Sequence, residues 1–256
     1  ETKIKLTNFS ITKINNPKIL VAGCGTGRDA LHAATRYKNS SVLAIDLSIS
    51  SLKYAKRKSE ELGVNNIEYI QHDILDLNKL NRKFDIIICA GVLHHMNNPL
   101  KGWSILTSCL NDGGLCYIGL YSKLACKEII RLRNEISEKG IKYNNAQIKS
   151  YRALLSRSTT EQNEWLTHLQ DFYSTSMFRD LLFHTQEEQF TLPEIKKIIN
   201  DLGLVFCGFA DFRILNLFKK ENKSSCDLYN LDKWHLFESN NPHIFRGMYQ
   251  FWCQKK

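Results

Sequence analysis

The feature that most constrains this chain is a glycine-rich turn between an apolar run and a helical pattern. The apolar run covers residues 19–22, and glycines alternate with other residues from Gly23 to Gly27. Glycine adopts backbone angles that other residues avoid, and it puts no side chain in the way of a ligand. A strand that passes through such a turn into a helix brings backbone N–H groups and a helix N-terminus to one point. The turn therefore predicts a βα unit with a ligand site at its apex.

Apolar runs of strand length alternate with helical patterns over the first half of the chain, and the alternation returns near the end. Strands are expected at 19–22, 42–45, 67–70, 84–90, 115–120, 204–210 and 248–253. Strands that alternate with helices at this spacing form a parallel α/β sheet with right-handed crossovers. The fourth run is apolar after Asp85, which is typical of a strand that is covered on both faces.

The alternation stops at residue 122. Residues 122–190 contain no convincing strand pattern and instead indicate helices over 124–139, 145–155 and 161–189. A helix capped by Thr191 and ended by Gly203 restarts the alternation, and a polar segment at 219–243 precedes the last strand. We therefore expect a lead-in over 1–17, an α/β core over 18–121 and 191–256, and a helical cap inserted over 122–190.

Composition limits the class of protein that this chain can be. Hydrophobic residues make up 43% of the 256, which suits one domain with a substantial core. No apolar run approaches the roughly 20 residues that a membrane span needs, so no membrane partner is expected. The eight cysteines show no CxxC pair and no metal-type spacing, so we expect free thiols, a cytoplasmic setting and no metal. The net charge of +9 is compatible with an RNA substrate, although basic and aromatic residues do not interleave as in nucleic-acid-binding segments.

Polar residues follow the ends of the first three expected strands. The glycine turn follows the first strand, Asp46 follows the second and Asp73 follows the third. Ligands of open α/β sheets bind outside the carboxyl ends of the strands, so these residues are expected to share one site. A carboxylate after the second strand can accept both ribose hydroxyls of a nucleoside, and Asp73 with Ile74 can receive an adenine. The turn also satisfies the GxGxxG/A spacing of an NAD-binding Rossmann unit, and these residues alone leave that alternative open.

Five stretches, in strict order, resemble the successive motifs of class I S-adenosylmethionine-dependent methyltransferases: VAGCGTG, AIDLS, QHDIL, FDIIICAGVLHHM and NDGGLCYIGLY. The resemblance covers about residues 18–121 and returns in the final helix and strands from Thr191. It implies a seven-stranded, mostly parallel sheet whose last strand is antiparallel, with S-adenosylmethionine as the cofactor. One position departs from the pattern, because Val21 stands where many members carry an acid.

The resemblance also assigns residues to the cofactor, all of them near the carboxyl ends of the first four strands. It implies Gly23, Cys24 and Gly25 under the methionine part, Asp46 at the ribose, Asp73 and Ile74 at the adenine, Ala90 near the methionine end, and Gly27 and Leu47 beside them.

Candidate catalytic and substrate residues lie farther along the chain. His94 and His95 follow the fourth strand and are the nearest candidate bases, because imidazole titrates near neutral pH; the alternative is that both are structural. We predict that the insertion forms a helical lid over the substrate, with Tyr121, Arg179 and His184 as its polar contributors. The competing interpretation is that the insertion packs outside the sheet or forms a dimer surface.

Residues 171–195 resemble a narrower group, bacterial methyltransferase domains that follow TPR-type helical repeats. That resemblance, and a chain that begins with Glu1 rather than methionine, lead us to expect a TPR-type region upstream. We expect methyl transfer to a small-molecule or protein acceptor. The alternatives are an RNA methyltransferase, a nicotinamide-dependent Rossmann enzyme and a catalytically silent cofactor-binding domain. The sequence contains no NPPY-type motif, which disfavours an RNA methyltransferase. The His-His loop and the number of strands disfavour a nicotinamide-dependent enzyme.

Overall fold

The computed structural model of the protein describes residues 4–141, 144–157, 172–183, 187–222 and 225–256. The chain forms two compact units, which we call the sheet unit (Glu1–Ala125 with Glu188–Lys256) and the helical unit (Cys126–Glu187). The sheet unit contains the candidate cofactor residues.

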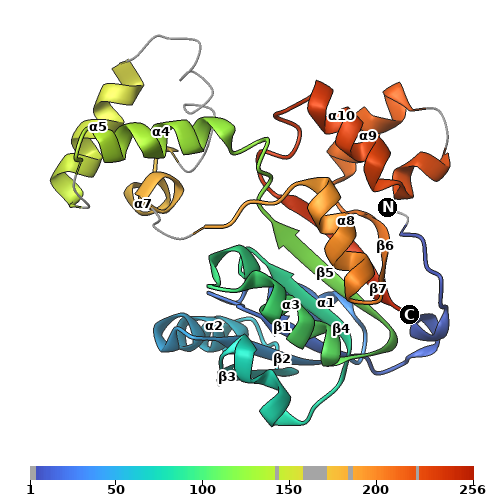
Figure 1. Ribbon diagram of the computed structural model, residues 1–256. Helices are drawn as coiled ribbons and strands as arrows, with labels where there is room; N and C mark the ends of the chain where they lie inside the picture. Colours follow the sequence, from blue (N-terminus) through green and yellow to red (C-terminus); the bar gives the residue numbers. More distant parts are fainter. Residues whose placement is uncertain (1–3, 142–143, 158–171, 184–186, 223–224) are drawn as a thin grey trace. The chain divides into compact units, whose positions relative to one another are not determined.

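The sheet unit is built on seven strands in the order β3-β2-β1-β4-β5-β7-β6 (Figure 1). The strands are β1 (Lys18–Ala22), β2 (Ser41–Asp46), β3 (Ile67–Gln71), β4 (Phe84–Ala90), β5 (Leu110–Leu120), β6 (Leu204–Phe209) and β7 (Tyr249–Lys255). Of these seven, β7 alone runs antiparallel to its neighbours, which confirms the predicted sheet. The strand order reverses between β1 and β4, so a crevice is expected at their carboxyl ends.

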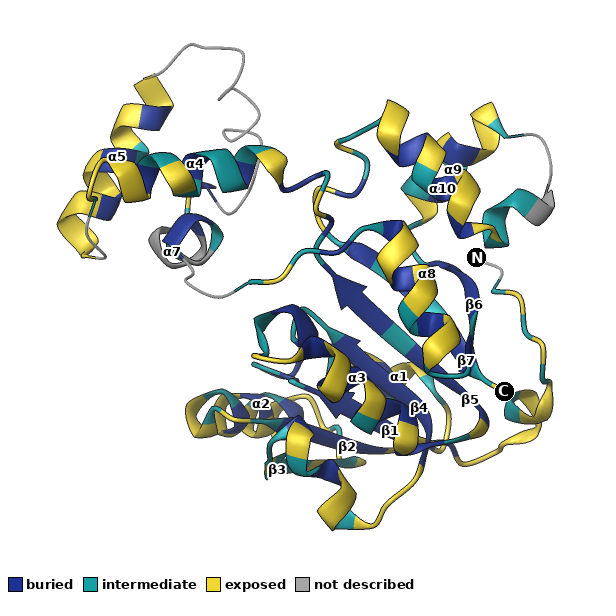
Figure 2. Cartoon of the chain, in the orientation of Figure 1, coloured by how far each residue is buried: buried dark blue, intermediate teal, exposed yellow. Residues whose placement is uncertain are grey.

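The two faces of the sheet belong to separate apolar layers. In β4, Ile87 and Cys89 point into one layer, and Ile86 and Ile88 point into the other, because successive side chains of a strand alternate. The first layer also receives buried residues from α3 (Pro99–Ser108), α8 (Leu192–Asp201), α9 (Phe212–Glu221) and α10 (Leu231–Asn240), and the second from α1 (Arg28–Arg36) and α2 (Ile49–Glu61). Figure 2 shows the strands largely buried between helices whose outer sides are exposed.

Two segments of the sheet unit differ from the prediction. The fifth strand begins at Leu110 rather than Leu115, because residues 112–114 continue the strand past a register shift against β4 instead of forming a turn that precedes it. The predicted polar segment 219–243 contains the end of α9 and all of α10. Its apolar residues Leu231, Trp234 and Phe237 recur every three positions and are buried, so the helix packs through one narrow stripe.

One glutamine ties the lead-in to the sheet. The buried Gln254 of β7 accepts hydrogen bonds at Oε1 from the N–H groups of Thr7 (2.8 Å) and Asn8 (3.0 Å) and from the Thr7 hydroxyl (2.9 Å). Its Nε2 donates to the carbonyls of Asn8 (2.6 Å) and Gly113 (2.9 Å). The lead-in is thus hydrogen-bonded to the last strand of the sheet, although the two are at opposite ends of the sequence.

The helical unit contains α4 (Lys127–Glu138), α5 (Asn145–Arg157) and α7 (Thr175–Phe183). The first two correspond to the predicted helices 124–139 and 145–155. Of the predicted helix 161–189, the described part contains α7, and residues 161–171 and 184–186 lie outside the described ranges. Within those ranges no helix has the length and apolar composition that crossing a bilayer requires.

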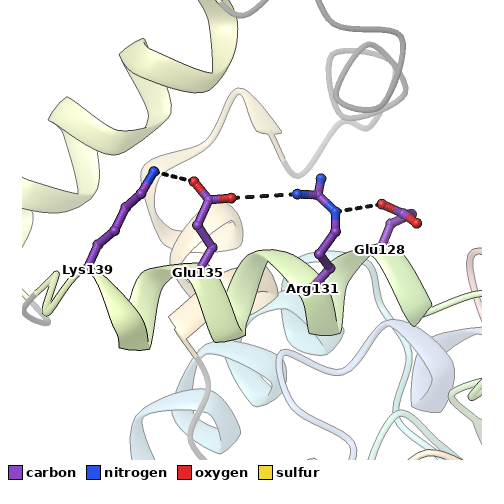
Figure 3. A network of polar contacts seen from close by, with 4 residues as sticks. All are labelled: Glu128, Arg131, Glu135 and Lys139. Carbon is purple, nitrogen blue, oxygen red and sulfur yellow. Dashed lines mark hydrogen bonds and ion pairs between the residues drawn. The ribbon is translucent and has the colours of Figure 1, made fainter.

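Charged residues on α4 serve two different purposes. On one face, Glu128, Arg131, Glu135 and Lys139 form a row of ion pairs at i,i+3 and i,i+4 spacing (Figure 3); such pairs stabilise a helix by a few tenths of a kcal/mol each. On another face, the guanidinium of Arg133 donates to both carboxylate oxygens of Glu187 (3.1 and 3.0 Å) and to the carbonyl of Leu181. Arg133 thereby joins α4 to the end of α7.

Replacing Gln254 tests whether the lead-in is an integral part of the sheet unit. Gln254→Ala removes five hydrogen bonds and leaves buried backbone groups without partners, so we expect it to lower the free energy of unfolding by about 2–3 kcal/mol. Urea unfolding followed by tryptophan fluorescence measures the change. Lys56→Ala on the exposed surface of α2 is the control and should change the free energy by less than about 0.5 kcal/mol. Equal effects of the two substitutions would contradict this account.

Candidate functional site

The glycine turn leaves β1 alongside the carboxyl end of β2. The N–H groups of Gly23 and Cys24 both donate to the carbonyl of Ile45, at 2.8 and 2.9 Å, and Gly27 N–H donates to the carbonyl of Cys24 at 2.9 Å. The φ angles of Gly23, Gly25 and Gly27 are +71°, +52° and +91°. Only glycine adopts such angles without strain, so the alternation of glycines follows from the backbone path.

Two of these glycines are also required by packing, and one is not. A Cβ on Gly23 would lie 2.3 Å from Cγ2 of Val92, and a Cβ on Gly27 would lie 2.7 Å from Cβ of Ala55. A Cβ on Gly25 would meet no heavy atom of the described chain within 4 Å. Gly25 therefore borders open space, where a ligand can approach the backbone closely.

Asp46, the last residue of β2, holds the glycine turn in place. Its Oδ2 accepts a hydrogen bond from Gly25 N–H at 2.7 Å, and its Oδ1 accepts one from Ser48 N–H at 2.8 Å. The carbonyl of Asp46 accepts from His72 N–H at 3.2 Å, which joins the end of β2 to the residue after β3. Each carboxylate oxygen has a second lone pair, so the same carboxylate can also accept hydroxyl groups of a ligand.

The residues expected at an adenine differ in how much surface they offer. Asp73 Oδ1 accepts from Leu75 N–H at 2.8 Å and caps the short 3-10 helix Ile74–Leu80. Ile74 is only 6% exposed and belongs to the first apolar layer. Leu47 is 65% exposed, and its carbonyl accepts from Nε2 of Gln71 at 2.9 Å. Leu47 thus presents apolar surface next to Asp46, whereas Ile74 presents almost none.

Cys24 and Ala90 supply surface rather than reactive groups. Burial, and secondarily the charge of Asp46, raises the pKa of the Cys24 thiol to about 12. The thiol is therefore protonated near neutral pH and is a poor nucleophile. Ala90 is half-buried at the end of β4, where Gly119 of β5 leaves room for it: a Cβ on Gly119 would lie 2.9 Å from the Ala90 backbone.

The loop after β4 brings the candidate bases against Tyr121. The ring of His94, which is fully buried, lies 4.1 Å from that of Tyr121 and 4.3 Å from that of His95, measured between centroids. The rings of His95 and Tyr121 are 6.3 Å apart, and both residues are half-buried. The two candidate bases and one predicted substrate residue therefore form a single aromatic cluster, which we call the His-Tyr cluster.

The other two predicted substrate residues are not part of this cluster in the described structure. Arg179 lies in α7 of the helical unit, and His184 lies outside the described residues. Their role in a lid over the substrate stays a prediction.

Sequence reasoning missed a buried polar group that begins at Ser122, the residue after Tyr121. Glu238 accepts hydrogen bonds from the hydroxyl groups of Ser122 and Tyr249, which are 127 positions apart in the chain. The only local signal is Glu238 itself, a carboxylate within about one turn of two buried apolar residues of α10, Trp234 and Phe237. A pattern of that kind also fits an exposed helix edge, so it does not reveal a partner.

A cavity of about 830 Å³ lies elsewhere in the sheet unit. It is bounded by the lead-in, by α1 and by one face of β4, β5 and β7, and its described lining includes no predicted site residue. The predicted cofactor residues and the His-Tyr cluster instead lie near the carboxyl ends of the strands, where a parallel sheet binds ligands.

The strand order, the antiparallel β7 and the glycine turn after β1 define the class of protein, an α/β protein with a Rossmann-like methyltransferase fold. A family model described as a methyltransferase domain matches residues 15–179. This match covers more than half of the chain, and the chain therefore belongs to the methyltransferase-domain family.

Individual proteins are similar to most of this chain. An uncharacterized protein of Synechococcus sp. is 29% identical over 252 residues, which cover 91% of this chain and 59% of that protein. PKMT2 from Rickettsia typhi matches with a TM-score of 0.70 and 20% identity, over 99% of this chain and 50% of that chain. The structure of PKMT2 in complex with AdoHcy gives the same TM-score and identity over 94% and 49%. The chain thus spans about half of the length of PKMT2, and the structural likeness shows the shared fold.

The family implies S-adenosylmethionine as the cofactor, and the residues present fit it. Open space borders the backbone at Gly25, and the carboxylates of Asp46 and Asp73 are acceptors for the hydroxyl and amino donors of an adenosine. These groups lie after β1, β2 and β3, which are adjacent in the sheet.

Adding one methyl group at Gly25 tests this location. Gly25→Ala meets no neighbouring atom, so it should cost only the left-handed backbone strain of about 1–2 kcal/mol. The new Cβ occupies the space assigned to the ligand, so affinity for S-adenosylhomocysteine should fall at least about tenfold, or about 1.4 kcal/mol. Isothermal titration calorimetry measures the affinity.

Gly63→Ala is a matched control for this substitution. Gly63 also has a positive φ, +67°, and open space around its Cβ position. It follows the far end of α2, about 20 Å from Ser48 at 1.5 Å per residue. The control should cost similar stability and leave the affinity unchanged. Equal losses of affinity in the two variants would show that the ligand does not bind next to Gly25.

Proposed function

We propose that this protein transfers a methyl group from S-adenosylmethionine to a small-molecule or protein acceptor at the His-Tyr cluster. The observation that carries the proposal is the close approach of two loops: Val92, two residues before His94, fills the space that the absent side chain of Gly23 leaves. The loop that would hold the cofactor and the loop that would meet the acceptor are therefore in direct contact.

In this proposal the strand ends hold the cofactor. The backbone at Gly23, Cys24 and Gly25 lies under its methionine part, and Gly27 completes the turn. Asp46 accepts the ribose hydroxyls through the lone pairs that Gly25 and Ser48 do not use. Leu47 covers one side of the adenine, and its exposure makes it the stronger candidate beside the buried Ile74.

The acceptor meets the half-buried members of the His-Tyr cluster. The cofactor supplies a methyl group that is activated by a positively charged sulfur. The protein has to hold the attacking atom roughly 3–3.5 Å from that methyl group and in line with it. In this proposal His95 removes a proton from the acceptor and Tyr121 contacts the acceptor, while the buried His94, whose ring lies against both of theirs, supports them.

An RNA acceptor is the second candidate, and the net charge of +9 is the observation that favours it. Basic and aromatic residues do not interleave in the sequence as they do in nucleic-acid-binding segments. We therefore place RNA second. The same proposal includes a substrate lid formed by the helical unit, with Arg179 and His184 as its polar contributors. It also includes a TPR-type region upstream.

Cofactor identity is tested by thermal shift. S-adenosylmethionine and S-adenosylhomocysteine should each raise the melting temperature, because a ligand at 100 times its Kd adds about 2.7 kcal/mol to the stability of the folded state. NADH at the same concentration should leave the melting temperature unchanged. A shift with NADH and none with the two sulfur ligands would establish the nicotinamide alternative.

Acceptor class is tested with a labelled methyl group. The protein is incubated with S-adenosylmethionine carrying a tritiated methyl and with an extract separated into small molecules, protein and RNA. Label should enter the small-molecule or the protein fraction, and Gly25→Ala should reduce it at equal protein concentration. Label confined to material that ribonuclease releases would make RNA the substrate, and no label in any fraction would favour a silent cofactor-binding domain.

A further inference from the structure

The buried carboxyl group of Glu238 has an arrangement that packing alone does not explain. Glu238 lies on α10 and is 1% exposed. The hydroxyl groups of Ser122 and Tyr249 both donate to its Oε1, each at 2.6 Å. Ser122 lies two residues after the end of β5, and Tyr249 is the first residue of β7. One oxygen of α10 thus receives hydrogen bonds from two neighbouring strand ends.

A carboxyl group in this place is costly for the fold. Burial raises the pKa of Glu238, and the hydrogen bonds that its carboxyl group accepts from Ser122 and Tyr249 oppose this rise only in part. Nearby apolar residues of the same helix, Leu231, Trp234 and Phe237, pack without any such cost. A buried polar group that a neighbouring apolar residue could replace is expected to serve specificity of arrangement rather than stability.

The group that Glu238 arranges is the chain on either side of Tyr121. On the preceding side, Leu120 pairs with Tyr249 across β5 and β7. On the following side, the Ser122 hydroxyl donates to Glu238 and accepts from the N–H of Ala125 at 3.0 Å. Both neighbours of Tyr121 are therefore connected, directly or through Tyr249, to the same carboxyl oxygen.

Tyr121 in turn contacts the candidate reactive loop. Its ring lies 4.1 Å from the ring of His94, and its carbonyl accepts from the N–H of Phe190 at 2.9 Å. The carbonyl of His94 accepts from the N–H of Glu188 at 2.8 Å. The segment 188–190 thus holds the backbones of Tyr121 and His94, and the carbonyl of Phe190 also accepts from the N–H of Lys123 at 2.9 Å. Between these two backbone bonds, the Ser122 hydroxyl adds a side-chain bond to Glu238.

We propose that Glu238 is a positioning residue, which holds the Tyr121 ring against His94 through the hydroxyl groups of Ser122 and Tyr249. Without the acceptor oxygen, two buried hydroxyl groups lose their shared partner, Ser122 turns away, and the Tyr121 ring leaves His94. The consequence for methyl transfer rests on the proposed function, whereas the position of the ring does not.

The experiment measures the ring contact directly by NMR. The protein is labelled with ¹³C at the Cε1 position of histidine, and the His94 signal is assigned from its loss in His94→Gln. The Tyr121 ring shifts this signal because the centroids of the two rings are only 4.1 Å apart. Tyr121→Leu supplies the reference position without the ring.

Three variants then separate positioning from general destabilisation. Glu238→Ala should move the His94 signal most of the way to the Tyr121→Leu position. Glu238→Gln keeps an acceptor oxygen and should restore the signal close to its wild-type position. Thr107→Ala removes another buried hydroxyl group, one that bonds only to Trp103 within α3, and should leave the signal unchanged.

Two further variants keep the proposal testable if Glu238→Ala does not fold. Ser122→Ala should reproduce the shift, and Tyr249→Phe should produce a smaller one because the bond from Ser122 to Glu238 remains. An unmoved His94 signal in folded Ser122→Ala or Glu238→Ala overturns the proposal. S-adenosylhomocysteine affinity, measured on the same samples, should be unchanged in all of them. A wild-type protein that binds no S-adenosylhomocysteine but shows the shifts would refute the proposed function and leave the positioning role in place.

Discussion

The carboxylate of Asp46 joins the ends of two neighbouring strands, and the rest of the site depends on it. One oxygen binds the N–H of Gly25 in the turn after β1, and the other binds the N–H of Ser48 at the start of α2. Hydrogen bonds to a charged group contribute about 1.5–3 kcal/mol each, and the N-terminus of a helix favours a negative charge nearby. The turn therefore keeps its left-handed glycine conformations without help from a bound ligand.

A second constraint connects this turn to the opposite side of the crevice. The side chain of Val92 occupies the space beside Gly23, so the loop after β4 approaches the backbone of the turn as closely as a glycine allows. Two residues later the same loop supplies His94, and the residue directly after β5 is Tyr121, whose ring lies against that of His94. A change at Gly23 would thus be expected to disturb both halves of the site, whereas a change at Gly25 would affect only the half assigned to the cofactor.

The parts of this arrangement that could be predicted from sequence are the local ones. Apolar runs and the caps at Ser48 and Thr191 identify the strands and the beginnings of two helices, because backbone geometry and one nearby side chain determine them. The wrong start of β5 shows the limit of this approach. Residues 112–114 have turn composition, and they belong to the strand because Leu110 and Leu115 on either side of them both pair with β4.

The long-range contacts could not be predicted in this way. Gln254 bonds to residues near the start of the chain, and Glu238 bonds to Ser122, 116 positions away. The residues around Gln254 and Glu238 in the sequence form no pattern from which the hydrogen-bonding partners could be predicted. For a related reason, the sequence does not predict α10. Three buried residues among polar ones give only a weak amphipathic pattern, and the helix is stabilised by the packing of these residues in the core.

The most direct measurement of the central claim is an isotope-filtered NOE spectrum of the protein with S-adenosylmethionine labelled with ¹³C at its transferable methyl group. If the turn and Asp46 hold the cofactor with that methyl group toward the His-Tyr cluster, cross-peaks should appear to ring protons of Tyr121 or His95. Cross-peaks to His32 or Tyr37, which line the cavity between the lead-in and α1, with none to the His-Tyr cluster, would contradict it.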